Sequence, residues 1–363
     1  MRKKPANDAP SPLEQIQAYL NQNKGDHYNF EEERSYTVSS GSLLLDIEMG
    51  GGIGPGVIRA SGITEGGKTS CALAFAKNFQ KMDNAMVVYV KSEGRLSKDM
   101  IARSGVSTEE EKWFVYKSNV YESVISLMRE LVKNNPENCK YMFIIDSMDS
   151  LVPKNDLDKP PEEANKVAGG ALLSSDFLRK MALGLTIRGH ICYMVSQVRS
   201  KVSINPYERT DARVTNASGG NALLHFSDWI LEFQQRHLKD VISTEANGKG
   251  DSLGHWCKVV FKKTPNEKTG ALVRYPIRYH RLDGKSIWVE YEVVDMLLAF
   301  DMAKKAGAWV TISDELIGEV EKETKLEFKK QHQGMDNLRK YFEENPMIGK
   351  YLFNKFREVL KKS

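Results

Sequence analysis

Long apolar segments are missing from this 363-residue sequence, and cysteine is scarce. No apolar run approaches the roughly 20 residues that a membrane helix needs, and no apolar segment follows the basic start MRKKPANDAPSP. We therefore expect neither a membrane anchor nor a signal peptide, and a cytoplasmic protein. The four cysteines are far apart and mostly lie in apolar runs: Cys71, Cys139, Cys192 and Cys257. This placement predicts reduced, packed thiols rather than disulfides or a zinc site.

A strong excess of either charge is also missing. Lys and Arg together number 52 and Asp and Glu 48, which gives a net charge of +4. A polyanion would therefore have to bind at local clusters of cations and not over the whole surface. Hydrophobic residues make up 41% of the chain, as in ordinary folded proteins, and the length allows one large core with one or two small domains.

The pattern of residues divides the chain into three parts. Residues 1–35 contain a polar linker and one predicted helix, which Ser11 can cap and whose apolar face is formed by Leu13, Ile16, Tyr19 and Leu20. Residues 36–290 alternate predicted strands and helices. Residues 291–363 are rich in Lys and Arg and are predicted to form a small, mainly helical C-terminal domain.

The central part predicts an α/β fold. Short apolar segments predict buried strands at residues 57–61, 85–91, 113–117, 141–146 and 191–197. Helical patterns lie between them at residues 68–81, 121–135 and 172–185. This alternation is typical of a mainly parallel sheet that helices cover on both faces. Three more strands then follow without helices, at residues 228–236, 254–263 and 274–281, and predict an antiparallel edge.

A glycine-rich stretch, SGITEGGKTS, follows the first predicted strand and opens the first helix of the central part. Its spacing is that of a phosphate-binding loop, which combines converging backbone N–H groups with a lysine for the outer phosphates and a hydroxyl for Mg²⁺. An ordinary glycine turn is the alternative. The nucleotide-binding residues predicted here are Gly62, Ile63, Thr64, Glu65, Gly66, Gly67, Lys68, Thr69 and Ser70.

Two carboxylates lie at the ends of predicted strands. Asp146 ends YMFIID, where a carboxylate can hold the water shell of the metal beside Thr69. Glu93 follows the strand at residues 85–91, where a carboxylate can orient and deprotonate the water that attacks a γ-phosphate. The alternatives are a turn role for Asp146 and a salt bridge from Glu93 to Lys91 or Arg95.

A long polar loop follows the strand that ends at Gln197. It carries four cations around one aromatic residue and closes on two glycines: Arg199, Lys201, Tyr207, Arg209, Arg213, Gly219 and Gly220. Guanidinium groups suit phosphates, and a tyrosine can stack on bases, so the composition predicts contact with nucleic acid. A merely solvated loop is the alternative.

Several motifs together resemble the RecA family of homologous-recombination ATPases, in its bacterial and phage branch. SSGSLLLDIEMGGGIGPGVIRASG is similar to the segment before the family's phosphate loop, and FIIDSMDSLVPK to its metal-aspartate strand. SQVRSK and GGNAL resemble the borders of its second DNA loop, and KKAGAWV the entry to its C-terminal domain. The motifs occur in family order and span nearly the whole chain.

The resemblance implies a RecA-type ATPase core that uses ATP and Mg²⁺. It implies that Lys68, Thr69 and Asp146 bind the nucleotide and metal, that Glu93 is the catalytic base, and that Gln197 senses the γ-phosphate. It also implies DNA loops at about residues 155–170 and 199–220. The implied DNA-binding residues are Arg179, Arg199, Lys201, Tyr207, Arg209, Arg213, Gly219, Gly220 and Asn221.

The resemblance further implies a filament that forms on single-stranded DNA and pairs it with homologous double-stranded DNA. In such a filament the N-terminal helix would dock on the adjacent subunit, and Lys262 and Lys263 would reach the neighbour's ATP. A loading mediator and a single-strand-binding protein are further candidate partners, and no membrane is implied. Two alternatives remain open: a hexameric helicase or other motor on the same core, and a non-catalytic DNA-coating protein.

Some residues depart from the family pattern. Thr64, Glu65 and Gly66 replace residues that are usually small or hydroxylic, and Lys91 stands where relatives mostly carry Asp. Met100 takes the place of an aromatic that stacks on adenine. His225 replaces an interface Phe, and its titration would make assembly sensitive to pH; an ordinary polar substitution is the alternative.

The C-terminal sequence is basic. From Lys329 onward it has nine Lys or Arg and four Asp or Glu, and it ends without an acidic tail. The excess of positive charge predicts attraction for duplex DNA, and a solvated helical face is the alternative.

Overall fold

A computed structural model describes residues 10–93, 96–157, 169–199, 216–217, 225–245 and 250–362. Side chains are described in these ranges except at residues 169–174, 198–199, 216–217 and 361–362. Within the described ranges, no helix combines the length and the apolar character that crossing a membrane requires.

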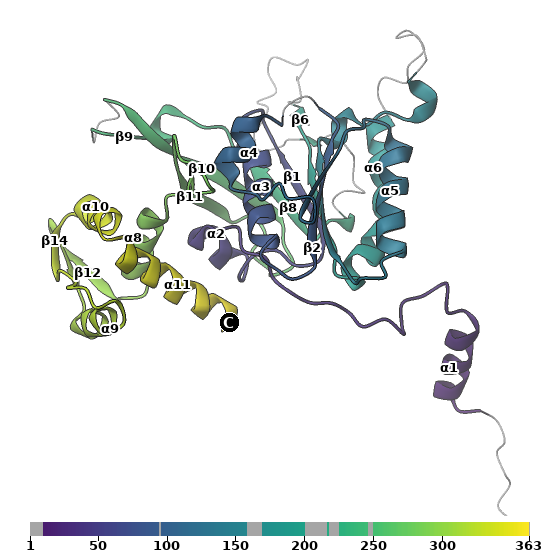
Figure 1. The fold of residues 1–363 in the computed structure, drawn as a ribbon, viewed down its shortest axis with the longest axis horizontal. Coiled ribbons are helices and arrows are strands. Elements are labelled where there is room, and N and C mark those ends of the chain that lie inside the picture. Colours follow the sequence, from purple (N-terminus) through teal and green to yellow (C-terminus); the bar gives the residue numbers. More distant parts are fainter. Residues whose placement is uncertain are drawn as a thin grey trace, which may run out of the picture.

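A nine-stranded mixed sheet forms the centre of the molecule (Figure 1). Its strands are β1 Gly56–Gly62, β2 Ala85–Lys91, β3 Trp113–Tyr116, β4 Lys140–Asp146, β5 Ile191–Val195, β8 Trp229–Phe233, β9 Val241–Ser243, β10 Ser252–Lys263 and β11 Leu272–Arg278. The order is β11-β10-β8-β1-β5-β4-β2-β3, with β9 paired to β10. The strands from β8 to β3 are parallel and β10 is antiparallel to β8 and β11, which confirms the predicted fold class and its antiparallel edge. The short strands β6 Val198–Arg199 and β7 Asn216–Ala217 form a separate pair.

Helices cover both faces of this sheet (Figure 1). The first face carries α2 Leu43–Glu48, α3 Lys68–Phe79 and α4 Lys98–Ser104, and the second carries α5 Tyr121–Lys133 and α6 Gly169–Ile187. In β1, Val57 packs in the core of the second face and Ile58 in that of the first. Because side chains alternate along a strand, a continuous apolar run such as β1 serves both cores at once.

The N-terminal helix α1, Pro12–Gln22, lies apart from the sheet at the end of an extended segment (Figure 1). Its start is as predicted: Ser11 caps it, and Ser11 and Glu14 bond to each other's backbone N–H groups. No residue of α1 is buried, and Ile16 and Tyr19 of the predicted apolar face are 56% and 64% exposed. Leu13, Ile16 and Tyr19 of this face are therefore left largely uncovered by the described chain, while Leu20 is partly buried.

The C-terminal part has its own hydrophobic core and contains a sheet that the sequence pattern did not predict. Its helices are α8 Val289–Ala299, α9 Asp314–Thr324, α10 Met335–Glu344 and α11 Pro346–Lys362. Three short antiparallel strands lie among them: β12 Ala303–Ala306, β13 Trp309–Ile312 and β14 Gln331–Gln333. The C-terminal part is therefore rich in helices, as predicted, and also contains a small antiparallel sheet that was not predicted.

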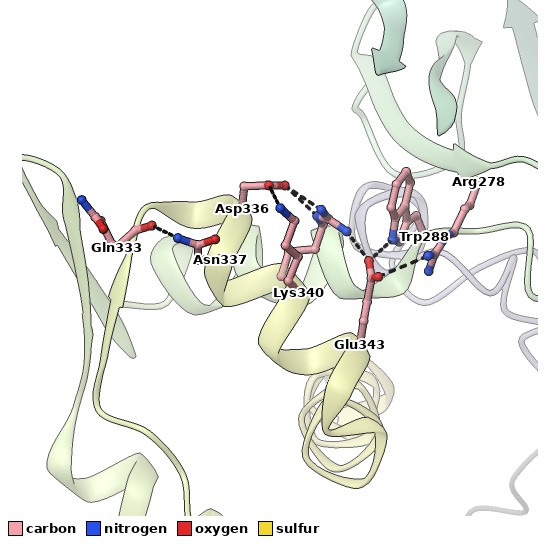
Figure 2. Close-up of polar contacts among 8 residues, drawn as sticks. Arg278, Trp288, Gln333, Asp336, Asn337, Lys340 and Glu343 are labelled. Atoms are coloured by element: carbon pink, nitrogen blue, oxygen red, sulfur yellow. Dashed lines mark hydrogen bonds and ion pairs between the residues drawn. The ribbon is translucent and has the colours of Figure 1, made fainter. Parts of the chain in front are cut away.

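A polar cluster joins the edge of the central sheet to this part of the chain (Figure 2). Glu343 of α10 accepts hydrogen bonds from Trp288 Nε1 at 2.8 Å and from Arg278 Nη2 at 3.2 Å. The guanidinium groups of Arg278 and Arg339 lie 4.7 and 4.9 Å from the centre of the Trp288 ring. Since Trp288 is only 1% exposed, these cation–π contacts and charged hydrogen bonds hold α10 firmly against the end of β11.

Glu292 of α8 forms a second connection to the core. Its carboxyl group is buried and accepts hydrogen bonds from the Ser42 hydroxyl and from the backbone N–H of Leu43, the latter at 2.9 Å. Burial raises the pKa of Glu292 to about 8, although these two hydrogen bonds favour the charged form. The folded chain therefore binds a proton here over a pH range in which the unfolded chain releases it.

Because of this linkage, we predict that the free energy of unfolding depends on pH through the Glu292 carboxyl group. Between the unfolded pKa of 4.5 and the folded pKa of about 8, the folded state binds more protons than the unfolded state, so stability falls as pH rises. We expect the free energy of unfolding of the wild type to fall more steeply than that of Glu292→Gln, by up to roughly 1.4 kcal/mol per pH unit. Urea titrations across this range measure the two slopes. Glu315→Gln, at an exposed position, is the control, and equal slopes for wild type and Glu292→Gln would contradict the prediction.

Candidate nucleotide and DNA site

The predicted phosphate loop connects β1 to α3 and lies directly against β8 and β10. Gly62 and Gly67 have φ angles of 138° and 105°, which favour glycine. A Cβ atom on Gly62 would lie 2.3 Å from the backbone oxygen of Phe233, and one on Gly67 would lie 3.3 Å from Cys257 Sγ. The glycines are therefore required for close packing as well as for the exposure of backbone N–H groups.

Lys68 is the first residue of α3 and is only 8% exposed. Its Nζ donates hydrogen bonds to the backbone oxygens of Gly62 at 2.8 Å and Ile63 at 2.5 Å, so the loop wraps around the ammonium group. The N-terminus of α3 and this ammonium group together make the loop strongly attractive to an anion. Glu65 and Ser70 lie exposed beside it.

Thr69 and Asp146, the two residues predicted to hold the metal, contact each other at the base of the loop. Thr69 Oγ1 donates to Asp146 Oδ2 at 2.8 Å, and Tyr89 Oη donates to the same oxygen at 2.6 Å. Burial, reinforced by the charge of Asp146, raises the pKa of Tyr89 far above its usual value, so the phenol remains a donor. The sequence pattern did not indicate Tyr89.

One hydroxyl and one carboxylate fit Mg²⁺, which usually keeps several waters and takes further ligands from substrate phosphates. In the described part of the chain, no group of three or more His, Cys, Asp and Glu residues lies close enough to hold a metal ion. Thr69 and Asp146 remain the residues predicted to hold Mg²⁺.

Glu93 lies two residues beyond the end of β2, close to the end of β4. Ser147 Oγ donates to Glu93 Oε1 at 2.5 Å, and Ser150 Oγ donates to the same oxygen at 3.2 Å. These two serines fix the carboxylate at the edge of the sheet that also carries Asp146. Neither serine was among the predicted site residues, because they become neighbours of Glu93 only when β2 and β4 pair.

Gln197 lies just beyond the end of β5, and a carboxylate holds its backbone. Its N–H donates to Asp149 Oδ2 at 2.6 Å. Arg59 of β1 is 2% exposed and donates from Nε to Ser196 Oγ at 3.0 Å. Burial lowers the pKa of Arg59 to about 10, and the charge of Asp149 opposes this shift. Arg59 and Asp149 are further residues at this strand end that the sequence pattern did not indicate.

The residues predicted for the adenine and for the subunit interface belong to different elements: Met100 to α4, and Lys262 and Lys263 to β10. Met100 of α4 lines the cavity that opens beside Gly67 and Ser70. Lys262 lies 3.5 Å from a carboxylate oxygen of Glu232. Lys263 Nζ donates to the backbone oxygen of His225 at 2.8 Å, so the two predicted interface positions contact each other.

The predicted DNA-binding residues fall mostly outside the described ranges. Arg179 lies exposed on α6, with Nη2 3.4 Å from Asp176 Oδ1. Most of the first loop, at 158–168, is outside the description, as are the following residues of the second loop: Lys201, Tyr207, Arg209, Arg213, Gly219, Gly220 and Asn221. For Arg199 the structure describes the backbone of β6 and not the side chain.

The close approach of the loop to β8 yields a stability prediction. Gly62→Ala would place a methyl group against the backbone oxygen of Phe233, and we expect it to lower the free energy of unfolding by roughly 2 kcal/mol or more. Gly50→Ala is a matched control, because Gly50 also has a positive φ, 68°, but a Cβ there meets no atom within 4 Å; we expect a loss of about 1 kcal/mol. Urea denaturation measures both variants. Equal losses would show that the loop does not depend on this packing.

The comparisons with known proteins agree with this geometry. The family model described as the RecA N-terminal domain matches residues 20–268, which contain the phosphate loop, Glu93, Asp146 and Gln197. The chain is also similar to "Protein RecA" of Halalkalibacterium halodurans, at 26% identity over 335 residues that cover 90% of this chain and 84% of that protein. The chain therefore belongs to the RecA family, the DNA recombinases and ATPases of recombination and repair.

Proposed function

We propose that this chain is a DNA-dependent ATPase that forms a helical filament on single-stranded DNA and pairs this strand with homologous duplex in the cytoplasm. The observation that carries the proposal is the convergence of the phosphate loop, the Thr69–Asp146 contact and Glu93 at one edge of the sheet. This edge, at the carboxyl ends of parallel strands, is where α/β proteins bind ligands.

In the proposed site, the backbone of the loop and the Lys68 ammonium group hold the triphosphate of ATP. Thr69 and Asp146 hold Mg²⁺, which when bound neutralises charge on the phosphates. Tyr89 stays protonated and donates a hydrogen bond to Asp146, which orients that carboxylate toward the loop. Lys68 exchanges its bonds to the backbone oxygens of Gly62 and Ile63 for bonds to phosphate.

Glu93 is the proposed catalytic base. Its carboxylate would orient a water molecule and accept a proton from it, while Ser147 and Ser150 keep the carboxylate in place. Hydrolysis does not supply the pairing chemistry, because base pairing itself reads the sequence of the DNA.

Gln197 is the proposed link between ATP and DNA. It stands between β5, which is paired to β1, and the segment predicted to be the second DNA loop. A shift of Gln197 toward a bound γ-phosphate would move the start of this loop. ATP would then select the state that binds DNA, and its loss would release the filament by a population shift.

The proposed filament uses two surfaces of the chain. The exposed apolar face of α1 would dock on the adjacent subunit, while Lys262 and Lys263 would reach the neighbour's ATP. Contacts of this head-to-tail kind do not close on themselves and generate helical assemblies. A mediator protein and a single-strand-binding protein are proposed to assist loading.

The basic C-terminal sequence is a weaker part of the proposal. Of the seven cations here whose side chains the structure describes, four form ion pairs within the C-terminal part: Lys330, Arg339, Lys340 and Lys355. Their positive charge is largely neutralised before DNA arrives. We therefore propose that duplex DNA is gathered mainly by cations elsewhere in the filament.

The central test is strand invasion. A labelled single strand is incubated with homologous supercoiled duplex, and joint molecules are scored with and without ATP. We expect wild-type protein to form joint molecules only with ATP and Lys68→Ala to form essentially none, because the variant lacks the cation inside the loop. Joint molecules formed equally well by Lys68→Ala would contradict the assignment of the phosphate loop.

A second variant, measured for ATP binding and for ATP hydrolysis in the presence of single-stranded DNA, separates binding from turnover. Glu93→Gln keeps the shape of the side chain but removes its basicity, so it should bind ATP normally and lose hydrolysis by a factor of about 100 or more. Normal hydrolysis would remove Glu93 from the mechanism. Filaments without hydrolysis in the wild type would favour a coating protein, and closed rings on electron micrographs would favour a helicase or motor.

The role of α1 predicts an assembly defect. The double variant Ile16→Glu with Tyr19→Glu places two charges on the exposed apolar face, and we expect it to abolish filaments while ATP binding by single subunits is retained. Gln17→Glu with Asn21→Asp adds the same charge at other exposed positions of α1 and is the matched control. Negative-stain microscopy with DNA and ATP gives the readout. Filaments of normal length from the first variant would exclude α1 from the interface.

A further inference from the structure

A cavity of about 930 Å³ lies between the ATPase core and the C-terminal part of the chain. It opens beside Gly67 and Ser70 of the phosphate loop, follows α3, and reaches Phe353 and Arg357 of α11. Figure 1 shows α11 passing below α2, to one side of the central sheet. The volume is within the range of about 300–1,000 Å³ that is typical of sites for small ligands.

The wall of this cavity is strongly cationic. Three Glu residues line it, and one of them, Glu343, is already paired with Arg278 and Arg339. Eight Lys or Arg residues line it. Four of these lie at the far end of α3 and on the elements that face it: Lys77, Lys81, Lys285 and Arg357. We call these four residues the far cation cluster.

No ion pair joins the far cation cluster to a carboxylate of the described chain, although the charges of Asp283 and Asp46 act on Lys77 and Arg357. Lys77 Nζ donates to the backbone oxygens of Asp283 and Gly284 at 3.1 and 3.3 Å, and Lys81 Nζ donates to Asn78 Oδ1 at 2.8 Å. Throughout the described ranges, no carboxylate lies within ion-pair distance of any of the four cations. The cluster therefore keeps its positive charge.

The four cations also act on one another. Burial, with repulsion from Lys285, lowers the pKa of Lys77, which the charge of Asp283 partly restores. Burial, with repulsion from Lys77 and Arg357, lowers the pKa of Lys81. Like charges gathered in a partly desolvated cleft oppose folding, and a bound anion would relieve this repulsion.

The cluster is separate from the triphosphate position. Lys77 follows Lys68 by nine residues, which corresponds to about 14 Å along α3, and Lys81 lies two residues beyond the end of this helix. The proposed adenine neighbour, Met100, lies on α4, whose last turn contacts the 283–284 backbone that Lys77 binds. A nucleotide whose phosphates occupy the loop and whose base reaches Met100 therefore leaves Lys81 and Arg357 unneutralised.

We propose that the far cation cluster binds the phosphate groups of a second small phosphorylated molecule, different from the ATP held by the phosphate loop. Apolar side chains of the same cavity, including Leu73, Ile287 and Phe353, would contact its organic part. Because Lys77 lies on α3, Lys81 lies just beyond its end and Arg357 lies on α11, the bound phosphates bridge the core and the C-terminal part. A ligand here thus holds the two parts together.

Isothermal titration calorimetry with inorganic tripolyphosphate tests this proposal. The full-length protein is first saturated with ADP and excess Mg²⁺, so that the phosphate loop is filled. We expect one tripolyphosphate per chain to bind, and Lys81→Ala with Arg357→Gln to weaken binding at least tenfold. Lys239→Ala with Lys350→Ala removes the same charge from exposed positions outside the cavity and should leave binding unchanged.

Four outcomes would overturn the proposal: no binding to the ADP-saturated protein, binding that appears only without ADP, equal weakening in the control pair, and loss of duplex-oligonucleotide binding alone in the cavity variant. Binding only without ADP would mean that tripolyphosphate occupies the phosphate loop. Equal weakening in the control pair would mean that the positive charge of the protein surface attracts it without a specific site. Loss of duplex binding alone would mean that the cluster contacts DNA. If Arg357→Gln unfolds, the single variant Lys81→Ala, at an exposed position, must still weaken binding. Failure of strand invasion leaves this test unaffected, because it needs no DNA.

Discussion

The register of four parallel strands is the constraint on which the proposed site depends. Lys91 of β2 pairs with Asp146 of β4, and Asp146 pairs with Val195 of β5. Val195 also pairs with Ala60 of β1, two residues before the phosphate loop. The segments that follow these strands therefore meet at one edge. A slip of one residue in any pair would turn alternate side chains to the opposite face and separate Thr69 from Asp146.

Bringing the strand ends together would by itself leave the polar side chains of the site crowded and poorly oriented. The edge of the sheet therefore also needs residues that hold Glu93 and Asp146 in position. Ser147 and Ser150 fix Glu93, and Tyr89 fixes Asp146. Arg59 is a buried cation in the strand that enters the loop, and it is tolerable there because Ser196 and the charge of Asp149 compensate its desolvation. The rigidity of the site thus comes from side chains that need not touch the nucleotide.

The parts of this arrangement that the sequence predicted are those defined by local patterns. The phosphate loop follows from its spacing, the start of α1 from its cap, and Asp146 from its place at the end of an apolar run. Ser147 and Ser150 contact Glu93 from 54 and 57 positions away, so no local pattern reveals them. The strands β12 to β14 are three or four residues long, and β14 is Gln-His-Gln, which gives no alternation of apolar and polar residues to detect.

The phosphate loop and the C-terminal part are joined through rigid elements and not only through the chain between them. α3 starts at the loop and continues as the wall of the cavity that α11 closes. β11 ends at Arg278, which Glu343 and Trp288 connect to α10, while Glu292 ties α8 to the start of α2. Packed elements of this kind move as units because protein interiors deform little. A displacement of α3 at the loop must therefore change the cavity at its far end, where the C-terminal part is attached.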